Sequence, residues 1–141
     1  MVFQEFKLKR WVIRMSKSIH INDLRTECAR FGANPYLLTQ GDDGRPHAVA
    51  VSIEWQEDCI LTTTGTKSAA NVAARPLLSL LWPPIEVGGY SLIVDGDGHV
   101  IGSGSDVRIS VTPTRGVLHR PGTSPASAAR DCGSDCIPLV G

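Results

Sequence analysis

The sequence predicts a mainly β protein, a small closed or split β-barrel accompanied by a few short helices. Roughly six segments show the alternating or continuous apolar patterns of strands. Turn residues separate these segments at short intervals, whereas helical periodicity is confined to short stretches. A βαβ fold would need regular alternation of strands with longer helices, so the pattern favours an antiparallel barrel.

Length and composition indicate one domain that does not bind nucleic acid or membranes. The chain has 141 residues and is 42% hydrophobic, which suffices for a single core. Lys plus Arg and Asp plus Glu number 14 each, so no global field attracts a polyanion. No apolar run approaches the roughly 20 residues of a membrane-spanning helix. The amino terminus lacks the features of a secretory signal, so we expect a cytoplasmic location.

The first predicted element is a helix over residues 22–31, preceded by residues 1–19 as an N-terminal arm that need not be ordered. Asn22 is a suitable N-cap, and Gly32 can end the helix. One face repeats apolar residues at intervals of three and four, namely Ile21, Leu24, Cys28 and Phe31. This face is expected to pack on the barrel.

Two strands and a hairpin follow this helix. Residues 36–40 form a short strand, and Gly41-Asp-Asp-Gly44 supplies residues that tolerate positive φ. The next strand alternates with a period of two over residues 48–55. Its apolar positions are Val49, Val51, Ile53 and Trp55, and its other face carries Ala48, Ala50, Ser52 and Glu54. A row of small side chains leaves room for a flat ligand or for a closely packed helix.

A third strand, a loop, a helix and a buried strand come next. Residues 59–64 form the strand, and Gly65-Thr-Lys-Ser68 interrupts it. Residues 69–74 are good helix formers, and Arg75-Pro76 ends the helix. Residues 77–82 form a nearly continuous apolar run of strand length, which is typical of a central strand.

The remaining predicted strands are shorter, and the end of the chain lacks the apolar pattern of a strand or helix. Strands are expected over residues 90–94, 99–101 and 107–111, with Asp95-Gly-Asp-Gly98 as a turn or bulge. A short helical turn is expected over residues 113–119. Residues 121–141 read as a flexible tail rich in Ser, Pro and Cys.

The four cysteines form no disulfide framework, and we expect no metal site. Only Cys132 and Cys136 lie close together, in a C-x3-C spacing. The alternative is that they supply two metal ligands, with His119, His99, Asp131 or Asp135 as the third and fourth. Structural zinc sites more commonly contain two such pairs. The two cysteines are therefore read as ordinary thiols of the tail.

Hydroxyl groups and one lysine gather at the start of the short helix. Thr62, Thr63 and Thr64 lead into Gly65, and Thr66, Lys67 and Ser68 follow it. Free backbone N–H groups at a helix start favour an anion, and a lysine adds a full charge. This is the outline of a phosphate site, although it is neither a Walker A loop nor a Rossmann fingerprint. The alternative is that Thr66 or Ser68 caps the helix while Lys67 is solvated.

Residues from about 24 to 120 resemble the pyridoxamine 5'-phosphate oxidase-like family of split β-barrels, which bind FMN or a deazaflavin. The resemblance depends on the order and spacing of several weak motifs. These motifs are Pro35-Tyr-Leu-Leu-Thr39, Asp43-Gly-Arg-Pro-His-Ala-Val-Ala-Val51, Thr64-Gly-Thr-Lys-Ser-Ala-Ala-Asn71, Leu80-Leu-Trp-Pro-Pro84, Gly88-Gly-Tyr-Ser-Leu-Ile-Val-Asp-Gly96 and Val117-Leu-His-Arg-Pro121. Residues 20–120 are accordingly expected to form the cofactor-binding domain.

The resemblance implies a homodimer with the cofactor at the subunit interface. Its phosphate would be held by Thr66, Lys67, Ser68 and Asn71. The ring and ribityl chain would lie against Ala50, Val51, Ser52, Thr62, Thr63 and Thr64. Trp82, Tyr90 or His119 would reach the ring from the partner subunit, while the alternative for the buried Trp82 is a place in the core.

The chain departs from the authentic oxidases of vitamin B6 in ways that bear on its activity. Those enzymes place an arginine on the second strand, whereas residues 48–52 carry no base. Oxidation of pyridoxamine phosphate is therefore not expected. The sequence is read as an FMN-dependent or deazaflavin-dependent oxidoreductase with an unidentified small organic substrate.

No catalytic side chain is predicted. His47, at the start of a strand, is expected to face solvent or a turn. The alternative function is a non-catalytic protein that binds or carries a flavin, haem or related tetrapyrrole on the same barrel.

Overall fold

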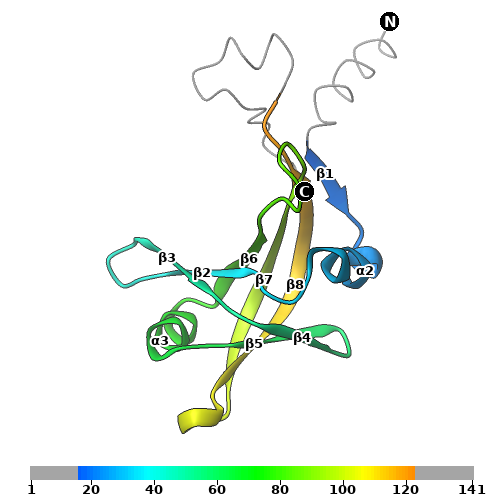
Figure 1. Ribbon diagram of the computed structural model, residues 1–141. Helices are drawn as coiled ribbons and strands as arrows, with labels where there is room; N and C mark the ends of the chain where they lie inside the picture. Colours follow the sequence, from blue (N-terminus) through cyan, green and yellow to red (C-terminus); the bar gives the residue numbers. More distant parts are fainter. Residues whose placement is uncertain (1–15, 123–141) are drawn as a thin grey trace, which may run out of the picture.

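The computed structural model describes residues 16–122, which form an eight-stranded antiparallel sheet with two α-helices and one 3-10 helix (Figure 1). The predicted mainly β fold is confirmed. The elements in chain order are β1 (Ser16–Ile19), α2 (Ile21–Phe31), β2 (Tyr36–Gln40), β3 (Pro46–Ala50), β4 (Ile53–Gln56), β5 (Cys59–Thr63), α3 (Thr66–Ala74), β6 (Leu77–Trp82), β7 (Ser91–Ile101), η1 (Gly104–Asp106) and β8 (Arg108–His119).

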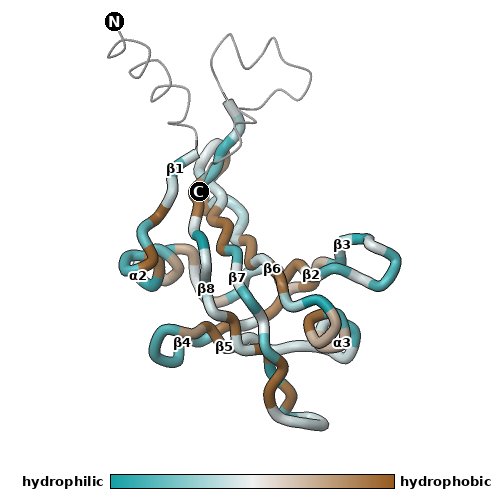
Figure 2. Tube along the Cα trace, turned by 180° about the vertical axis from the view of Figure 1, so that it is seen from behind, coloured by the Kyte–Doolittle hydropathy of each residue, from teal (hydrophilic) through white to brown (hydrophobic). Residues whose placement is uncertain are grey.

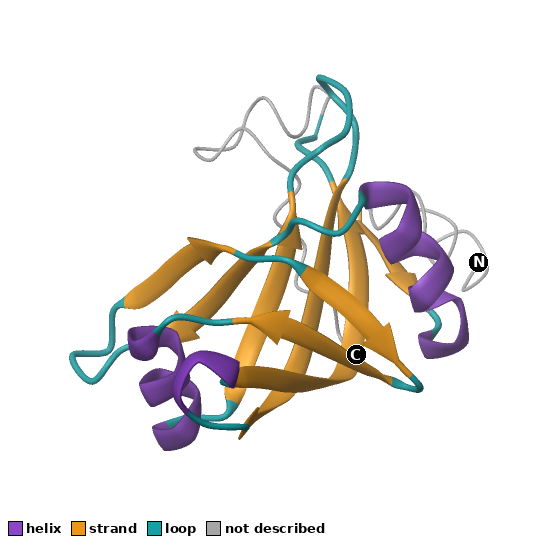
Figure 3. Ribbon diagram, turned by 60° about the horizontal axis from the view of Figure 1, so that its bottom comes forward, coloured by secondary structure: helices purple, strands orange, loops and turns teal. Residues whose placement is uncertain are grey.

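The sheet curves into a barrel that its hydrogen bonds leave open. The strand order is β3-β2-β6-β7-β8-β5-β4, and β1 pairs with the end of β8. The outermost strands, β3 and β4, are two halves of one bent segment joined by residues 51 and 52. Figure 3 shows α3 at one end of the curved sheet and α2 at the other. The result is a split barrel with a helix at each end.

The core lies inside this curve and contains most of the predicted inward-facing residues. Leu37, Leu80, Leu92, Val94 and Ile109 from four strands are fully buried. Leu24 and Cys28 of α2, and Val72 of α3, complete the packing from the helices. Figure 2 shows hydrophilic positions in the β2–β3 and β4–β5 turns and also on α2. Alternation of apolar and polar positions therefore decides which face of each strand is inside.

Four elements differ from the predictions. The N-cap of α2 is His20 rather than Asn22, and its ring accepts a hydrogen bond from the Asn22 N–H at 3.4 Å. Ser16–Ile19, assigned to the N-terminal arm, forms β1. The predicted 48–55 strand divides into β3 and β4. The segment 95–98 lies within the continuous strand β7 and is not a turn that ends it; its pairing with β8 shifts register between Asp95 and Gly96, where Thr114 of β8 is the extra residue.

The predicted helical turn over residues 113–119 is wrong, because β8 continues as a strand to His119. Proline is tolerated in sheets only at edges and bulges. Pro113 satisfies this rule, because β5 pairs with β8 only up to Val111 and β1 pairs only from Gly116 onward. Pro113 also lies opposite Gly96, next to the register shift at which Thr114 of β8 is the extra residue. Between the part of β8 that pairs with β5 and the part that pairs with β1, one side of β8 has no neighbouring strand. Pro113 is accommodated there because the strand is locally an edge strand.

Replacement of Gly96 by alanine should destabilise the barrel. An added Cβ would lie 2.6 Å from Val111 Cγ1 and 2.8 Å from the Thr112 carbonyl oxygen, and the backbone of β8 cannot move aside cheaply. We expect Gly96→Ala to lower the free energy of unfolding by about 1–3 kcal/mol in chemical denaturation. In the control Gly41→Ala the nearest atom to the added Cβ is a side-chain atom, Asp43 Oδ1 at 3.2 Å, so we expect a smaller loss of stability. Equal stability of the two variants would contradict the prediction.

Candidate functional site

An exposed strip of small side chains runs along β3 and into the bend that follows it. Ala48, Ala50 and Ser52, here called the small-residue strip, are exposed, while the alternate residues Val49 and Val51 face inward. The predicted two-residue period is thus confirmed. Within residues 16–122 no helix covers the strip, so the alternative of a closely packed helix does not hold for the described chain.

Apolar side chains continue the strip across the neighbouring strand. Tyr36 of β2 lies opposite Ala50 and is 44% exposed, and Leu38 lies opposite Ala48 and is half-buried. Leu77, at the start of β6, is 73% exposed. A surface of this kind is suited to contact with a flat ring or another protein surface.

Hydrogen bonds connect the small-residue strip to β5. The Ser52 N–H donates to Thr63 Oγ1 at 3.0 Å, and the Thr63 N–H donates to the Ser52 carbonyl at 3.0 Å. Ser52 Oγ donates to Asn34 Oδ1 at 3.1 Å. These bonds fix the bend between β3 and β4 beside the end of β5, so the strip leads directly to the segment before α3.

The start of α3 is open to solvent and lacks a side-chain cap. Its N-cap is Gly65, and no side chain accepts a hydrogen bond from the first turn. Thr66 and Lys67 are exposed, and Thr64 Oγ1 donates to the Gly65 carbonyl at 3.0 Å. The alternative in which Thr66 or Ser68 caps the helix is therefore not observed. Unpaired N–H groups at a helix start can bind an anion.

Other predicted site residues face the interior. Thr62 is fully buried, and Ser68 and Asn71 of α3 are 2% and 5% exposed. Asn71 Nδ2 donates to Thr39 Oγ1 of β2 at 3.1 Å, a buried bond that fastens α3 to the sheet. Ser68 is three residues from Asn71 and four residues from Val72, so both side chains lie beside Ser68 on the inward side of α3. The structure thus brings Ala50, Ser52, Thr63, Thr64, Thr66 and Lys67 toward the surface, and leaves Val51, Thr62, Ser68, Asn71 and Trp82 inside.

The residues suggested to reach a ring from a partner subunit have different surroundings. Trp82 is 2% exposed, and its Nε1 donates to the Gly32 carbonyl at 2.8 Å, which places it in the core. Tyr90 lies under the Lys17 ammonium and the Arg120 guanidinium, 5.4 and 4.7 Å from its ring centroid. His119 Nδ1 is hydrogen-bonded to Ser16 Oγ at 2.9 Å. His47 is half-buried in β3.

Residues 16–122 line at least three cavities, and Lys67 lines none of these three. One of these, of about 470 Å³, lies beside the exposed Leu77 and includes Leu38, Pro46 and Asp95. The other two adjoin α2 and share Tyr90. A ligand at the exposed start of α3 would therefore lie outside these three cavities.

Cys28 is not a candidate for nucleophilic catalysis. Burial, with a smaller contribution from the Glu27 carboxylate, raises the pKa of the Cys28 thiol from 9.0 to about 12. The thiol stays protonated at neutral pH, and only the thiolate is a strong nucleophile. Cys59 is half-buried, and Cys132 and Cys136 lie outside the described residues.

Alkylation of the native protein should distinguish the two described thiols. In the native state at pH 9, we expect iodoacetamide to modify Cys59 well before Cys28, as mapped by peptide mass spectrometry. The raised pKa also means that the folded state holds the Cys28 proton more tightly than the unfolded state. Its contribution to stability is therefore fully present below about pH 9 and is lost as the pH rises toward 12. Equal modification of Cys28 and Cys59 under native conditions would contradict this prediction.

Comparisons with known proteins place this geometry in context. No family model matches the sequence. Uncharacterized protein Mb0449c of Mycobacterium bovis is 35% identical over 116 residues, which cover 72% of this chain and 82% of the relative. Uncharacterized protein MT0457 of Mycobacterium tuberculosis matches with the same identity and coverage.

Several solved structures share the fold at low sequence identity. A Clostridium acetobutylicum protein of the pyridoxinephosphate oxidase family, related to general stress protein 26, has a TM-score of 0.57, 14% identity and coverage of 72% of this chain and 91% of that one. A FAD-binding protein of Mesorhizobium loti has a TM-score of 0.55 and 13% identity, with coverage of 73% and 96%. HutZ, the haem storage protein of Vibrio cholerae, has a TM-score of 0.51 and 12% identity, with coverage of 72% and 96%.

Proposed function

Because the chain belongs to the family of these two mycobacterial proteins and has the split β-barrel fold of the pyridoxamine 5'-phosphate oxidase-like proteins, we propose that it is a flavin-binding oxidoreductase. The proposed cofactor is FMN, with a deazaflavin as the alternative. The substrate is a small organic molecule other than pyridoxamine phosphate. The observation that carries the proposal is the uncapped start of α3 beside the exposed small-residue strip.

The residues of this surface fit an elongated cofactor with an anionic end. Lys67 and the first N–H groups of α3 would hold the phosphate, because a charge-assisted contact to a cation is stronger than a neutral hydrogen bond. Thr63, Thr64 and Thr66 offer hydroxyl groups along the chain that leads from the phosphate. Ala50 and Ser52 leave a flat surface on which a ring can rest.

The buried residues of the predicted site would hold α3 in place rather than touch the cofactor. Asn71 ties α3 to β2 through Thr39, and Ser68 and Thr62 pack beneath the same segment. A bound flavin supplies hydride or electron transfer, and the protein binds and orients it. No side chain among the described residues needs to act as an acid or base for that role.

A homodimer is part of the proposal. Lys67 and the small-residue strip are exposed, and apolar Tyr36 and Leu77 lie exposed on nearby strands. A second subunit on this face would cover these side chains and exclude water from the ring.

Within residues 16–122 neither α-helix is long and apolar enough to cross a membrane. We propose a cytoplasmic location.

The decisive experiment is the absorbance spectrum and mass spectrum of the protein purified from its native host. We expect an FMN or deazaflavin chromophore, or micromolar binding of added FMN by cofactor-free protein. Absence of both would overturn the proposal. Size-exclusion chromatography with light scattering tests the dimer separately.

A second candidate function is haem binding without catalysis. The fold-level likeness to HutZ favours it, as does the lack of a catalytic side chain among the described residues. A Soret band in place of a flavin spectrum, with no redox turnover, would favour this candidate over the first.

A further inference from the structure

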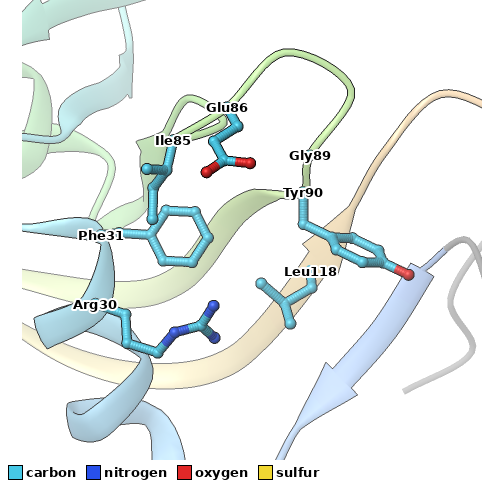
Figure 4. Close-up of a pocket in the computed structure, with 7 residues that line it drawn as sticks. All are labelled: Arg30, Phe31, Ile85, Glu86, Gly89, Tyr90 and Leu118. Carbon is cyan, nitrogen blue, oxygen red and sulfur yellow. The ribbon is translucent and has the colours of Figure 1, made fainter.

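A cavity of about 310 Å³ lies where the end of α2, the loop before β7 and the end of β8 meet (Figure 4). Small-molecule sites in proteins have volumes of roughly 300–1,000 Å³ and are mostly apolar with a few polar groups. The cavity has this character, and it is formed away from the start of α3. Its lining residues are Arg30, Phe31, Ile85, Glu86, Gly89, Tyr90 and Leu118.

The walls of this cavity are mainly apolar and aromatic. Figure 4 shows the Phe31 ring near Ile85 and Leu118, with Tyr90 beyond Leu118. Ile85 is 61% exposed, and Phe31, Tyr90 and Leu118 are half-buried. A ring-sized ligand in the cavity would remove this apolar area from water, which favours binding.

Arg30 gives the cavity a cationic group. Its guanidinium lies 5.9 Å from the Phe31 ring centroid, and Figure 4 shows it on the opposite side of that ring from the Glu86 carboxylate. Among the described residues, its ion pair is with Glu27, from Nη1 to Oε2 at 2.7 Å. A guanidinium has five N–H donors in a planar fork, so one such pair leaves donors for a carboxylate.

Further cations surround the Tyr90 wall. Lys17 and Arg120 lie over the Tyr90 ring. Among the described residues that line the cavity, Arg30 is the one cation and Glu86 the one anion, while Lys17 and Asp23 line the adjoining cavity. Glu27 offsets part of the Arg30 charge. The preference for an anion therefore depends on the Arg30 donors that Glu27 leaves unused.

We propose that this cavity binds a small organic anion with a flat apolar body. Its carboxylate would accept hydrogen bonds from Arg30, and its ring would lie against Phe31 and Leu118. This proposal concerns binding alone and is independent of flavin binding.

The cavity is also joined to the small-residue strip by a short segment of chain. Asn34, which accepts a hydrogen bond from Ser52, is three residues from Phe31, a separation of at most about 10 Å along the backbone. If the proposed function holds, the anion is accordingly the class of substrate that would lie near the cofactor ring. That assignment, unlike the binding itself, rests on the proposed function.

The test uses three probes that share one ring system and differ in charge. Naphthalene-2-carboxylate, naphthalene-2-methanol and 2-naphthylmethylammonium are titrated into the full-length, cofactor-free protein by isothermal titration calorimetry. We expect the carboxylate to bind most tightly and with one site per chain. Tighter binding of the ammonium, or equal binding of all three probes, would overturn the proposal.

Two substitutions with opposite expected effects locate the binding. Arg30→Gln should weaken carboxylate binding about 10-fold to 100-fold by loss of a charge-assisted contact. Glu86→Gln, on an exposed loop, should strengthen it severalfold by removing a like charge. In the control Arg45→Gln the lost side chain is 86% exposed, on the β2–β3 turn, and affinity should not change. Equal loss in Arg30→Gln and Arg45→Gln, or no change in either cavity variant, would overturn the proposal.

The same titrations separate this proposal from the proposed function. If FMN does not bind but the carboxylate binds in an Arg30-dependent way, the flavin proposal fails and the cavity proposal stands. If FMN binds and Arg30→Gln leaves carboxylate affinity unchanged, the reverse holds.

Discussion

Trp82→Ala should lower the free energy of unfolding by about 3–5 kcal/mol, because it empties the largest fully buried side-chain position of the described core. The same change removes the donor to the Gly32 carbonyl, at the residue that ends α2. We expect loss of this contact to weaken the attachment of α2 to the end of β6. Chemical denaturation with a fitted m-value measures the effect.

Trp82→Phe separates the core role of this residue from contact with a cofactor. Phenylalanine keeps much of the buried ring and loses the hydrogen bond, so we expect a loss of about 1–2 kcal/mol. FMN affinity should be retained in this variant if Trp82 acts only in the core. A variant of unchanged stability that no longer binds FMN would show instead that the indole contacts the cofactor.

Lys67→Ala should weaken FMN binding by about 1.5–3 kcal/mol, or roughly 10-fold to 100-fold, if its ammonium contacts the phosphate. The side chain is exposed in the described chain. Stability of the cofactor-free protein should therefore change little, within about 0.5 kcal/mol. Fluorescence titration with FMN gives the affinity, and the salt dependence of binding should decrease in the variant.

Two control variants accompany this measurement. Lys67→Arg keeps the positive charge and should recover most of the affinity. Arg45→Ala removes another exposed cation, on the β2–β3 turn, and should leave affinity unchanged. An unaltered dissociation constant in Lys67→Ala would remove the main support for a phosphate site at the start of α3.

Much of the fold could be predicted because its strands alternate regularly. The period of two over residues 48–55 gave the correct inward and outward faces, although the bend at residues 51 and 52 leaves no mark in the pattern. β1 was missed because Ser16-Lys-Ser-Ile19 is short and mostly polar. Its ladder depends on partners at the far end of the described chain, as in the pairing of Ser16 with His119.

Only part of the candidate site could be predicted from the sequence. Exposure of Ala50, Ser52 and Lys67 follows from local patterns. The inward direction of Asn71 depends on Thr39, which is 32 residues away in sequence. The spacing of Ser68, three residues before Asn71 and four before the apolar Val72, would have indicated it. The Arg30 cavity was missed altogether, because it combines α2, the 83–90 loop and the end of β8, and no single motif contains it.

The three ladders of β8 have a consequence for biosynthesis. β8 is the last strand of the described chain, and it pairs with β1, β5 and β7. During translation these three earlier strands must wait for residues 108–119 to emerge from the ribosome, with their pairing edges incomplete. Exposed strand edges are prone to association with other chains. Nascent chains stalled before residue 108 should accordingly bind chaperones and remain sensitive to protease, whereas chains released beyond residue 122 should become resistant.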